Sequence, residues 1–175
     1  LFILSSIFIL VYLDDKKNLS PLKRLIALTV LIYIICVNDK VAIINNFKFS
    51  FIENSIDFYQ LSLPFSICCY IFLIVALNMF DGINLQSSIM YFVNFLVIFF
   101  NLEFYNLIIF SIILGLIFFS FLNFKNKCFL GDSGSYLLSF IFAYYLIRVH
   151  NNTTIYFSDQ IVLILFFPVI DTLRV

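Results

Sequence analysis

Residues 76–86, ALNMFDGINLQ, interrupt a long apolar background at the point where one hydrophobic run ends and the next begins. An amide, an acid and a glycine arrive together there, as Asn78, Asp81 and Gly82. An ionised carboxylate beside hydrocarbon loses its hydration, so an acid in such a place usually has a function. The stretch therefore predicts a set of membrane helices that carry a polar site at their ends.

The composition indicates an integral membrane protein. Of the 175 residues, 63% are hydrophobic and only 11% are charged, whereas a soluble domain has about 45–50% apolar and about 25% charged residues. The formal net charge is zero, so the chain offers no basic face to nucleic acid. We therefore expect membrane lipid as a partner and no nucleic acid.

Long apolar runs follow one another along the chain. A bilayer core of about 30 Å is crossed by about 20 residues of α-helix, and strands with free edges cannot face lipid. The sequence therefore predicts an all-α, polytopic membrane helix bundle with about seven spans. These spans are residues 1–13, 22–38, 61–78, 86–101, 105–122, 135–149 and 159–171.

One segment between two spans predicts β-structure. Residues 41–51 are expected to form a small β-hairpin outside the membrane, because Asn45 and Asn46 tolerate a two-residue turn and phenylalanines alternate along the residues that follow. Residues 53–60 are expected to form a short interfacial helix.

The distribution of basic residues predicts the orientation. With alternating spans, seven of the ten Lys and Arg residues fall on the same side as Asp14, and three fall on the other side. The side richer in basic residues is expected to be cytoplasmic, in the inner (plasma) membrane of the cell. The acids on that side all sit where a helix meets a loop: Asp14, Asp15, Asp81, Asp132 and Asp171.

Each polar island also has a plain structural explanation. Residues 14–17 (DDKK) suit a cytoplasmic loop, Asn78 and Asp81 suit a helix cap, and residues 131–135 (GDSGS) suit a turn followed by an N-cap. None of these explanations accounts for every acid on the cytoplasmic side lying where a helix meets a loop. Carboxylates suit Mg²⁺, and lysines and helix N-terminal amides suit phosphate. We therefore predict phosphate chemistry at the membrane surface.

Four motifs carry a resemblance to a known family. They are residues 13–21 (LDDKKNLSP), 78–84 (NMFDGIN), 129–135 (FLGDSGS) and 168–172 (PVIDT). In this order, the sequence resembles the polyprenyl-phosphate N-acetylhexosamine-1-phosphate transferases, the bacterial glycosyltransferase family 4 that includes phospho-N-acetylmuramoyl-pentapeptide transferase. The resemblance implies a single transmembrane transferase domain over residues 1–175, truncated at both ends. About seven of about ten spans would be present, with the active site on the cytoplasmic face.

The resemblance also implies a reaction and roles for residues. A UDP-linked N-acetylhexosamine gives its sugar-1-phosphate to undecaprenyl phosphate, UMP is released, and a cell-envelope polysaccharide is initiated. Mg²⁺ is the expected cofactor, with Mn²⁺ as an alternative. By this resemblance Asp81 and Asp132 are metal ligands, and Asp14, Asp15 and Asp132 are catalytic. The residues expected to bind substrate are Lys16, Lys17, Asn78, Gly131, Ser133 and Asp171.

Two departures from the family pattern bear on function. Leu85 and Gln86 follow Asn84 where the family often has a second glycine, and the His-rich cytoplasmic motif of the family would lie beyond Val175. We therefore expect the isolated 175-residue fragment to be inactive. A cation- or proton-coupled transporter and a non-catalytic paralogue are the alternative functions. The sugar donor, the polysaccharide pathway and the oligomeric state, including a homodimer, stay open.

Overall fold

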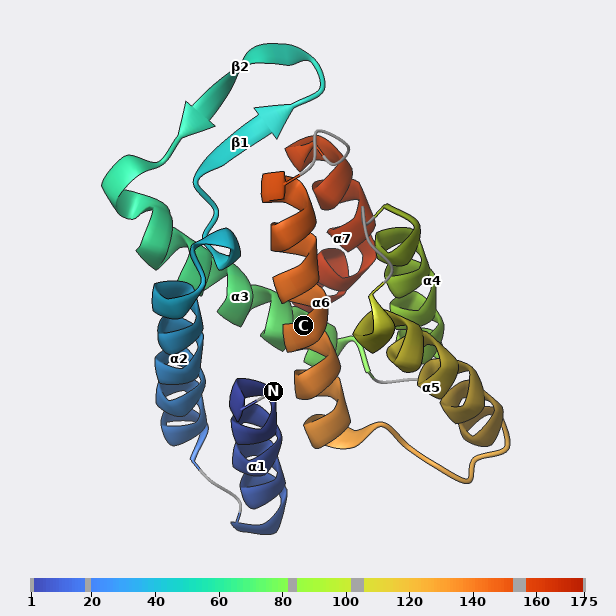
Figure 1. Ribbon diagram of the computed structural model, residues 1–175. Helices are drawn as coiled ribbons and strands as arrows, with labels where there is room; N and C mark the ends of the chain where they lie inside the picture. Colours follow the sequence, from blue (N-terminus) through green and yellow to red (C-terminus); the bar gives the residue numbers. More distant parts are fainter. Residues whose placement is uncertain (1, 18–19, 82–84, 102–105, 153–156, 175) are drawn as a thin grey trace.

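The computed structural model describes residues 2–17, 20–81, 85–101, 106–152 and 157–174. These residues form seven α-helices around one another, with a two-stranded sheet at one end (Figure 1). The helices are α1 (Phe2–Lys17), α2 (Pro21–Asn38), α3 (Ser62–Met79), α4 (Gln86–Asn101), α5 (Leu107–Phe124), α6 (Gly131–Asn152) and α7 (Ser158–Arg174). The strands are β1 (Asn46–Phe49) and β2 (Ile52–Asp57), flanked by the 3₁₀ helices η1 (Lys40–Ala42) and η2 (Tyr59–Leu61).

The prediction of a helical bundle is confirmed, since an α-helix lies over each apolar run. Within the described residues, three helices are long and apolar enough to cross a membrane: Pro21–Asn38, Tyr59–Met79 and Leu107–Phe124. Ser5–Asp14 and Gln86–Asn101 are shorter apolar helices. The count of about seven spans therefore stays a prediction.

Helix α6 lies at the centre of the bundle and packs against α1, α3 and α4 (Figure 1). Because its neighbours cover it, α6 can carry polar side chains that a helix facing lipid would avoid. Ser139 is buried, and its hydroxyl lies 2.7 Å from the hydroxyl of Tyr91 on α4. The outer helices differ: Phe118 on α5 is 68% exposed and Phe167 on α7 is 72% exposed. Such apolar surface is suited to lipid.

The predicted hairpin exists, but its predicted position is wrong. Strand β1 pairs with β2 in antiparallel fashion, and the turn lies at Ser50 and Phe51 rather than at Asn45 and Asn46. The residues expected to form the first strand, 41–44, begin instead within η1. The interfacial helix expected over residues 53–60 is also wrong, because β2 occupies most of that range.

Contacts with distant helices explain this shift. The amide of Asn151 at the end of α6 donates to the carbonyl oxygens of Val41 and Ile43, at 2.8 and 2.7 Å, so these carbonyls bind α6 rather than a partner strand. At the other end of the hairpin, Ser50 donates from its backbone nitrogen and its hydroxyl to Asp159, at 3.0 and 2.7 Å. The turn is therefore held where it meets the first turn of α7.

We predict that Asn151→Ala lowers the midpoint of thermal unfolding in detergent. The change removes two hydrogen bonds and leaves two carbonyls without their donor, a cost of about 1–3 kcal/mol. The matched control is Asn152→Ala, since Asn152 is the exposed neighbour on the same helix. Equal midpoints for the two variants would contradict the role given to Asn151.

Candidate active site

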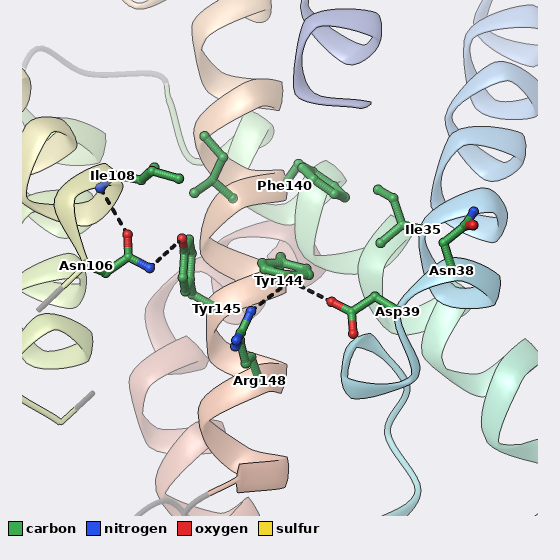
Figure 2. A pocket seen from close by; sticks show the side chains of 10 residues that line it. Ile35, Asn38, Asp39, Asn106, Ile108, Phe140, Tyr144, Tyr145 and Arg148 are labelled. Carbon is green, nitrogen blue, oxygen red and sulfur yellow. Dashed lines mark hydrogen bonds between the residues drawn. The ribbon is translucent and has the colours of Figure 1, made fainter. Parts of the chain in front are cut away.

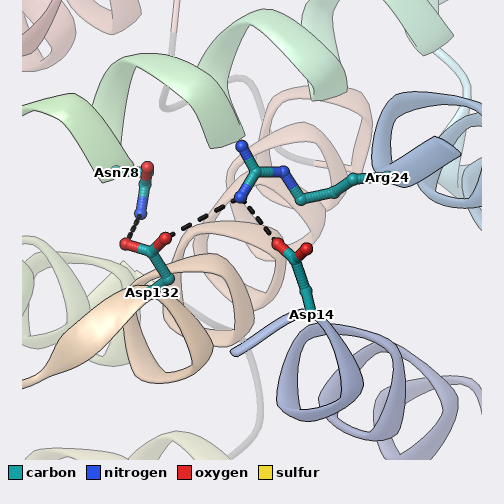
Figure 3. Close-up of polar contacts among 4 residues, drawn as sticks. All are labelled: Asp14, Arg24, Asn78 and Asp132. Carbon is teal, nitrogen blue, oxygen red and sulfur yellow. Dashed lines mark hydrogen bonds and ion pairs between the residues drawn. The ribbon is translucent and has the colours of Figure 1, made fainter. Parts of the chain in front are cut away.

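Two acids, an amide and an arginine from distant parts of the sequence meet at one end of the bundle. Asp14 comes from the last turns of α1, Asn78 from the last turn of α3, and Asp132 from the first turn of α6. Arg24, in the first turn of α2, lies between the two acids (Figure 3). We call these four residues the acid cluster.

The guanidinium of Arg24 joins the two carboxylates. Its Nη1 donates to Oδ2 of Asp14 at 2.7 Å and lies 3.7 Å from Oδ2 of Asp132. The side chain of Asp14 is only 7% exposed, whereas that of Asp132 is 54% exposed. Asn78 donates from Nδ2 to Oδ1 of Asp132 at 3.3 Å (Figure 3). The acid cluster therefore has one partly buried ion pair and one carboxylate that solvent or a ligand can reach.

Local sequence explains how these side chains are presented. Gly131 has φ +66°, a left-handed backbone that glycine adopts without strain, and α6 begins there. An acid in the first turn of a helix is favoured by the helix dipole, which suits Asp132. Arg24 is also in a first turn, after Pro21 starts α2, and a cation there is disfavoured. The two carboxylates offset that cost.

Asp81 follows α3 and is linked to the acid cluster through Asn78. The backbone nitrogen of Asp81 donates to the carbonyl oxygen of Asn78 at 3.2 Å. The hydroxyl of Ser87, which is buried in the first turn of α4, donates to Oδ1 of Asp81. Asn78 thus contacts Asp81 through the backbone and Asp132 through its side chain.

Sequence reasoning missed Asn123, a buried amide near the end of α5. Its Oδ1 accepts from the backbone nitrogen of Leu85 at 2.7 Å, and its Nδ2 donates to the carbonyl oxygen of Cys128 at 2.8 Å. Leu85 lies shortly after Asp81, and Cys128 lies shortly before Gly131. Asn123 therefore ties together the chain segments next to two of the predicted motifs. The signal was an amide at the end of a strongly apolar run.

The other predicted site residues are less closely connected to the acid cluster. Lys16 is exposed, and its Nζ lies 4.7 Å from the centre of the Tyr12 ring. Asp171 is half-buried in the last turns of α7. Within the described part of the chain, neither Lys16 nor Asp171 has a hydrogen bond or ion pair to the acid cluster. Ser133 is half-buried beside Asp132. The predictions for the Asp15 and Lys17 side chains, and for residues 82–84, lie outside what the structure describes.

The carboxylates near the acid cluster are the candidate ligands for a metal ion. Among the side chains that the structure describes, no group of three or more His, Cys, Asp or Glu is placed to hold a metal. Mg²⁺ often takes only one or two carboxylates and completes its shell with water and substrate phosphates. Asp81 and Asp132 supply two carboxylates of this kind: the Asp132 side chain is 54% exposed, and Oδ1 of Asp81 accepts from the hydroxyl of Ser87.

Comparison with known proteins bears on this site. The family model described as glycosyl transferase family 4 matches residues 1–150. Comparisons with the curated proteins and with the solved structures gave no significant match. The matched residues include the whole acid cluster and Asp81, whereas residues 168–172 lie outside them. Since the match covers most of the chain, the protein belongs to glycosyl transferase family 4.

Proposed function

We propose that this protein transfers N-acetylhexosamine 1-phosphate from a UDP-sugar to undecaprenyl phosphate, releasing UMP and initiating a cell-envelope polysaccharide. Family membership supports a membrane transferase with a sugar-phosphate donor and a lipid-phosphate acceptor. The observation that carries the proposal is the acid cluster, in which Arg24 lies between two carboxylates at one end of a membrane helix bundle. The positive-inside rule supports the cytoplasmic side as the location of that end.

In the proposed reaction, an oxygen of the acceptor phosphate attacks the phosphorus that carries the sugar. A new phosphorus–oxygen bond forms, the bond to UMP breaks, and UMP leaves with the electron pair. The second pKa of a phosphate monoester is near about 6, so the acceptor is largely dianionic at neutral pH. The harder task is to hold two anions together in line, and this task calls for positive charge.

The residues of the site divide this work. Asp81 and Asp132 would hold Mg²⁺ or Mn²⁺, which supplies charge neutralisation for the diphosphate and stabilises the leaving UMP. Arg24 would bind phosphate through its guanidinium, which suits phosphate oxygens. Asp14 would orient Arg24, because its carboxylate is buried against that guanidinium. The proposed catalytic role of Asp15 follows the family resemblance, as do the proposed substrate contacts of Lys16, Lys17, Asn78, Gly131, Ser133 and Asp171.

The placement of the acids favours this proposal over a transporter. Ion paths across a membrane use acids near the middle of the bilayer. Asp14, Asp81 and Asp132 lie instead at or near helix ends. A non-catalytic paralogue would be expected to have lost such residues, and all three are present.

We predict that Asp81→Asn lowers lipid-dependent UMP release by roughly a hundredfold or more, a loss typical of removing one transition-state electrostatic partner. The assay uses the intact protein in nanodiscs with undecaprenyl phosphate, Mg²⁺ and UDP-N-acetylglucosamine. Asp57→Asn is the matched control, because it removes the same charge from the exposed end of β2. Release with another UDP-sugar alone would keep the reaction and change the donor. No release with any donor from folded protein would contradict the proposal.

We also predict that Arg24→Gln lowers both turnover and the midpoint of thermal unfolding, because it removes the guanidinium that faces the buried carboxylate of Asp14. The control is Lys23→Gln, which removes a charge from the exposed adjacent residue. In the double variant Asp14→Asn with Arg24→Gln, the buried charge is gone, so the midpoint should recover while turnover stays low. Recovery of turnover along with the midpoint would show that Arg24 acts only on stability.

A further inference from the structure

A pocket of about 420 Å³ opens at the opposite end of the bundle from the acid cluster, between α2, α5 and α6 (Figure 2). Arg24 and Asp132 are in the first turns of α2 and α6. Asp39 directly follows α2, and Arg148 is in the second half of α6, so these two line the pocket from the far ends of the same helices. The proposed transferase chemistry uses none of the residues that line this pocket.

In this pocket, the carboxylate of Asp39 and the guanidinium of Arg148 both hydrogen-bond to the hydroxyl of Tyr144. The hydroxyl of Tyr144 donates to Oδ2 of Asp39 at 2.7 Å, and Nη1 of Arg148 donates to the Tyr144 oxygen at 3.1 Å (Figure 2). Oδ1 of Asp39 is also in use, since it accepts from the backbone nitrogen of Val41 at 3.1 Å. In the part of the chain that the structure describes, Asp39 and Arg148 form no direct ion pair. The pocket therefore presents two opposite charges a short distance apart.

The polarity of the wall changes with depth in the same direction on all three helices. On α6, Phe140 lies eight residues before Arg148, which is about 12 Å of helix. On α2, Ile35 lies one turn before Asp39, and on α5 Ile108 lies deeper than Asn106. Polar groups therefore lie at the helix ends and apolar groups lie toward the middle of the bundle. A lipid has the same order of headgroup and chain.

A buried hydroxyl lies behind this wall. Tyr70 of α3 is fully buried, and its hydroxyl has no hydrogen-bond partner among the described residues. Its ring stacks on Phe140, with 5.9 Å between the ring centroids. An unpartnered buried hydroxyl costs about 1–3 kcal/mol. Tyr70 supports Phe140 from behind and does not itself line the pocket.

We propose that this pocket binds the headgroup of a zwitterionic phospholipid from the membrane leaflet opposite the acid cluster. The phosphate would lie at Arg148, whose planar guanidinium suits phosphate oxygens, and a primary ammonium would lie at Asp39. Phosphatidylethanolamine carries both groups a few bonds apart. The carboxylate of Asp39 would repel a headgroup that is only anionic, and Arg148 would repel a ligand that is only cationic. Each of these ligands therefore fits only half of the pocket.

The test is lipid retention by the intact purified protein, measured by native mass spectrometry. Phosphatidylethanolamine and phosphatidylglycerol with the same acyl chains are offered at equal concentrations. The variants are Asp39→Asn and Arg148→Gln. Their charge-matched controls are Asp57→Asn, in the exposed hairpin, and Lys127→Gln, in the exposed loop after α5. The assay does not involve turnover, so its outcome is independent of the proposed transferase function.

Wild type should retain phosphatidylethanolamine in preference to phosphatidylglycerol. Each pocket variant should weaken that binding roughly tenfold, the loss expected for one hydrogen bond to a charged group. Asp39→Asn should also shift the preference toward phosphatidylglycerol, because only the cation remains.

Equal retention by wild type and both pocket variants, or a wild-type preference for phosphatidylglycerol, would overturn the proposal. If either pocket variant fails to fold, the wild-type comparison still decides, together with Arg148→Lys, which keeps the charge and should retain most of the binding.

Discussion

Arg24 holds together two acids that would otherwise repel each other at the end of a membrane bundle. One of them, Asp14, is almost fully buried, and an unpaired carboxylate in such a place would lose its hydration without compensation. The guanidinium itself has an unfavourable place in the first turn of α2, so all three groups depend on one another. The same contact brings α1, α2 and α6 together and leaves Asp132 open to a ligand. Stability and the proposed chemistry therefore rest on one set of contacts.

The central helix α6 connects the two ends of the molecule. It carries Asp132 in its first turn and Arg148 in its second half, and neighbouring helices enclose the part between them. That enclosure allows Ser139 and Tyr145 to lie within the bundle, where the Ser139 hydroxyl contacts that of Tyr91 and the Tyr145 hydroxyl accepts from Asn106. Polar groups at both ends of an enclosed helix give the protein two polar ends, each with acidic and basic side chains, separated by an apolar core.

Asparagine amides make many of the contacts between distant segments. An amide offers donors and acceptors without the cost of burying a charge, which suits a bundle with few ions. Each of these residues joins two elements far apart in the sequence: Asn78 reaches Asp132, Asn106 reaches Tyr145, Asn123 reaches Leu85, and Asn151 reaches Val41. The loops next to the acid cluster and the outer hairpin are positioned in this way.

Helices and their approximate limits could be predicted from the sequence alone, because an apolar run in a membrane satisfies its backbone only within itself. The same local logic indicated that Asp14, Asp81 and Asp132 lie at helix ends, and the motifs around them indicated the family. Tertiary contacts determined the rest. Arg24 pairs with Asp132 across 108 positions in the sequence, Asn123 joins two loops, and Asn151 shifts the hairpin away from its expected turn. Hydrophobic patterns are local, whereas a buried hydrogen bond depends on which distant group the packing brings within reach.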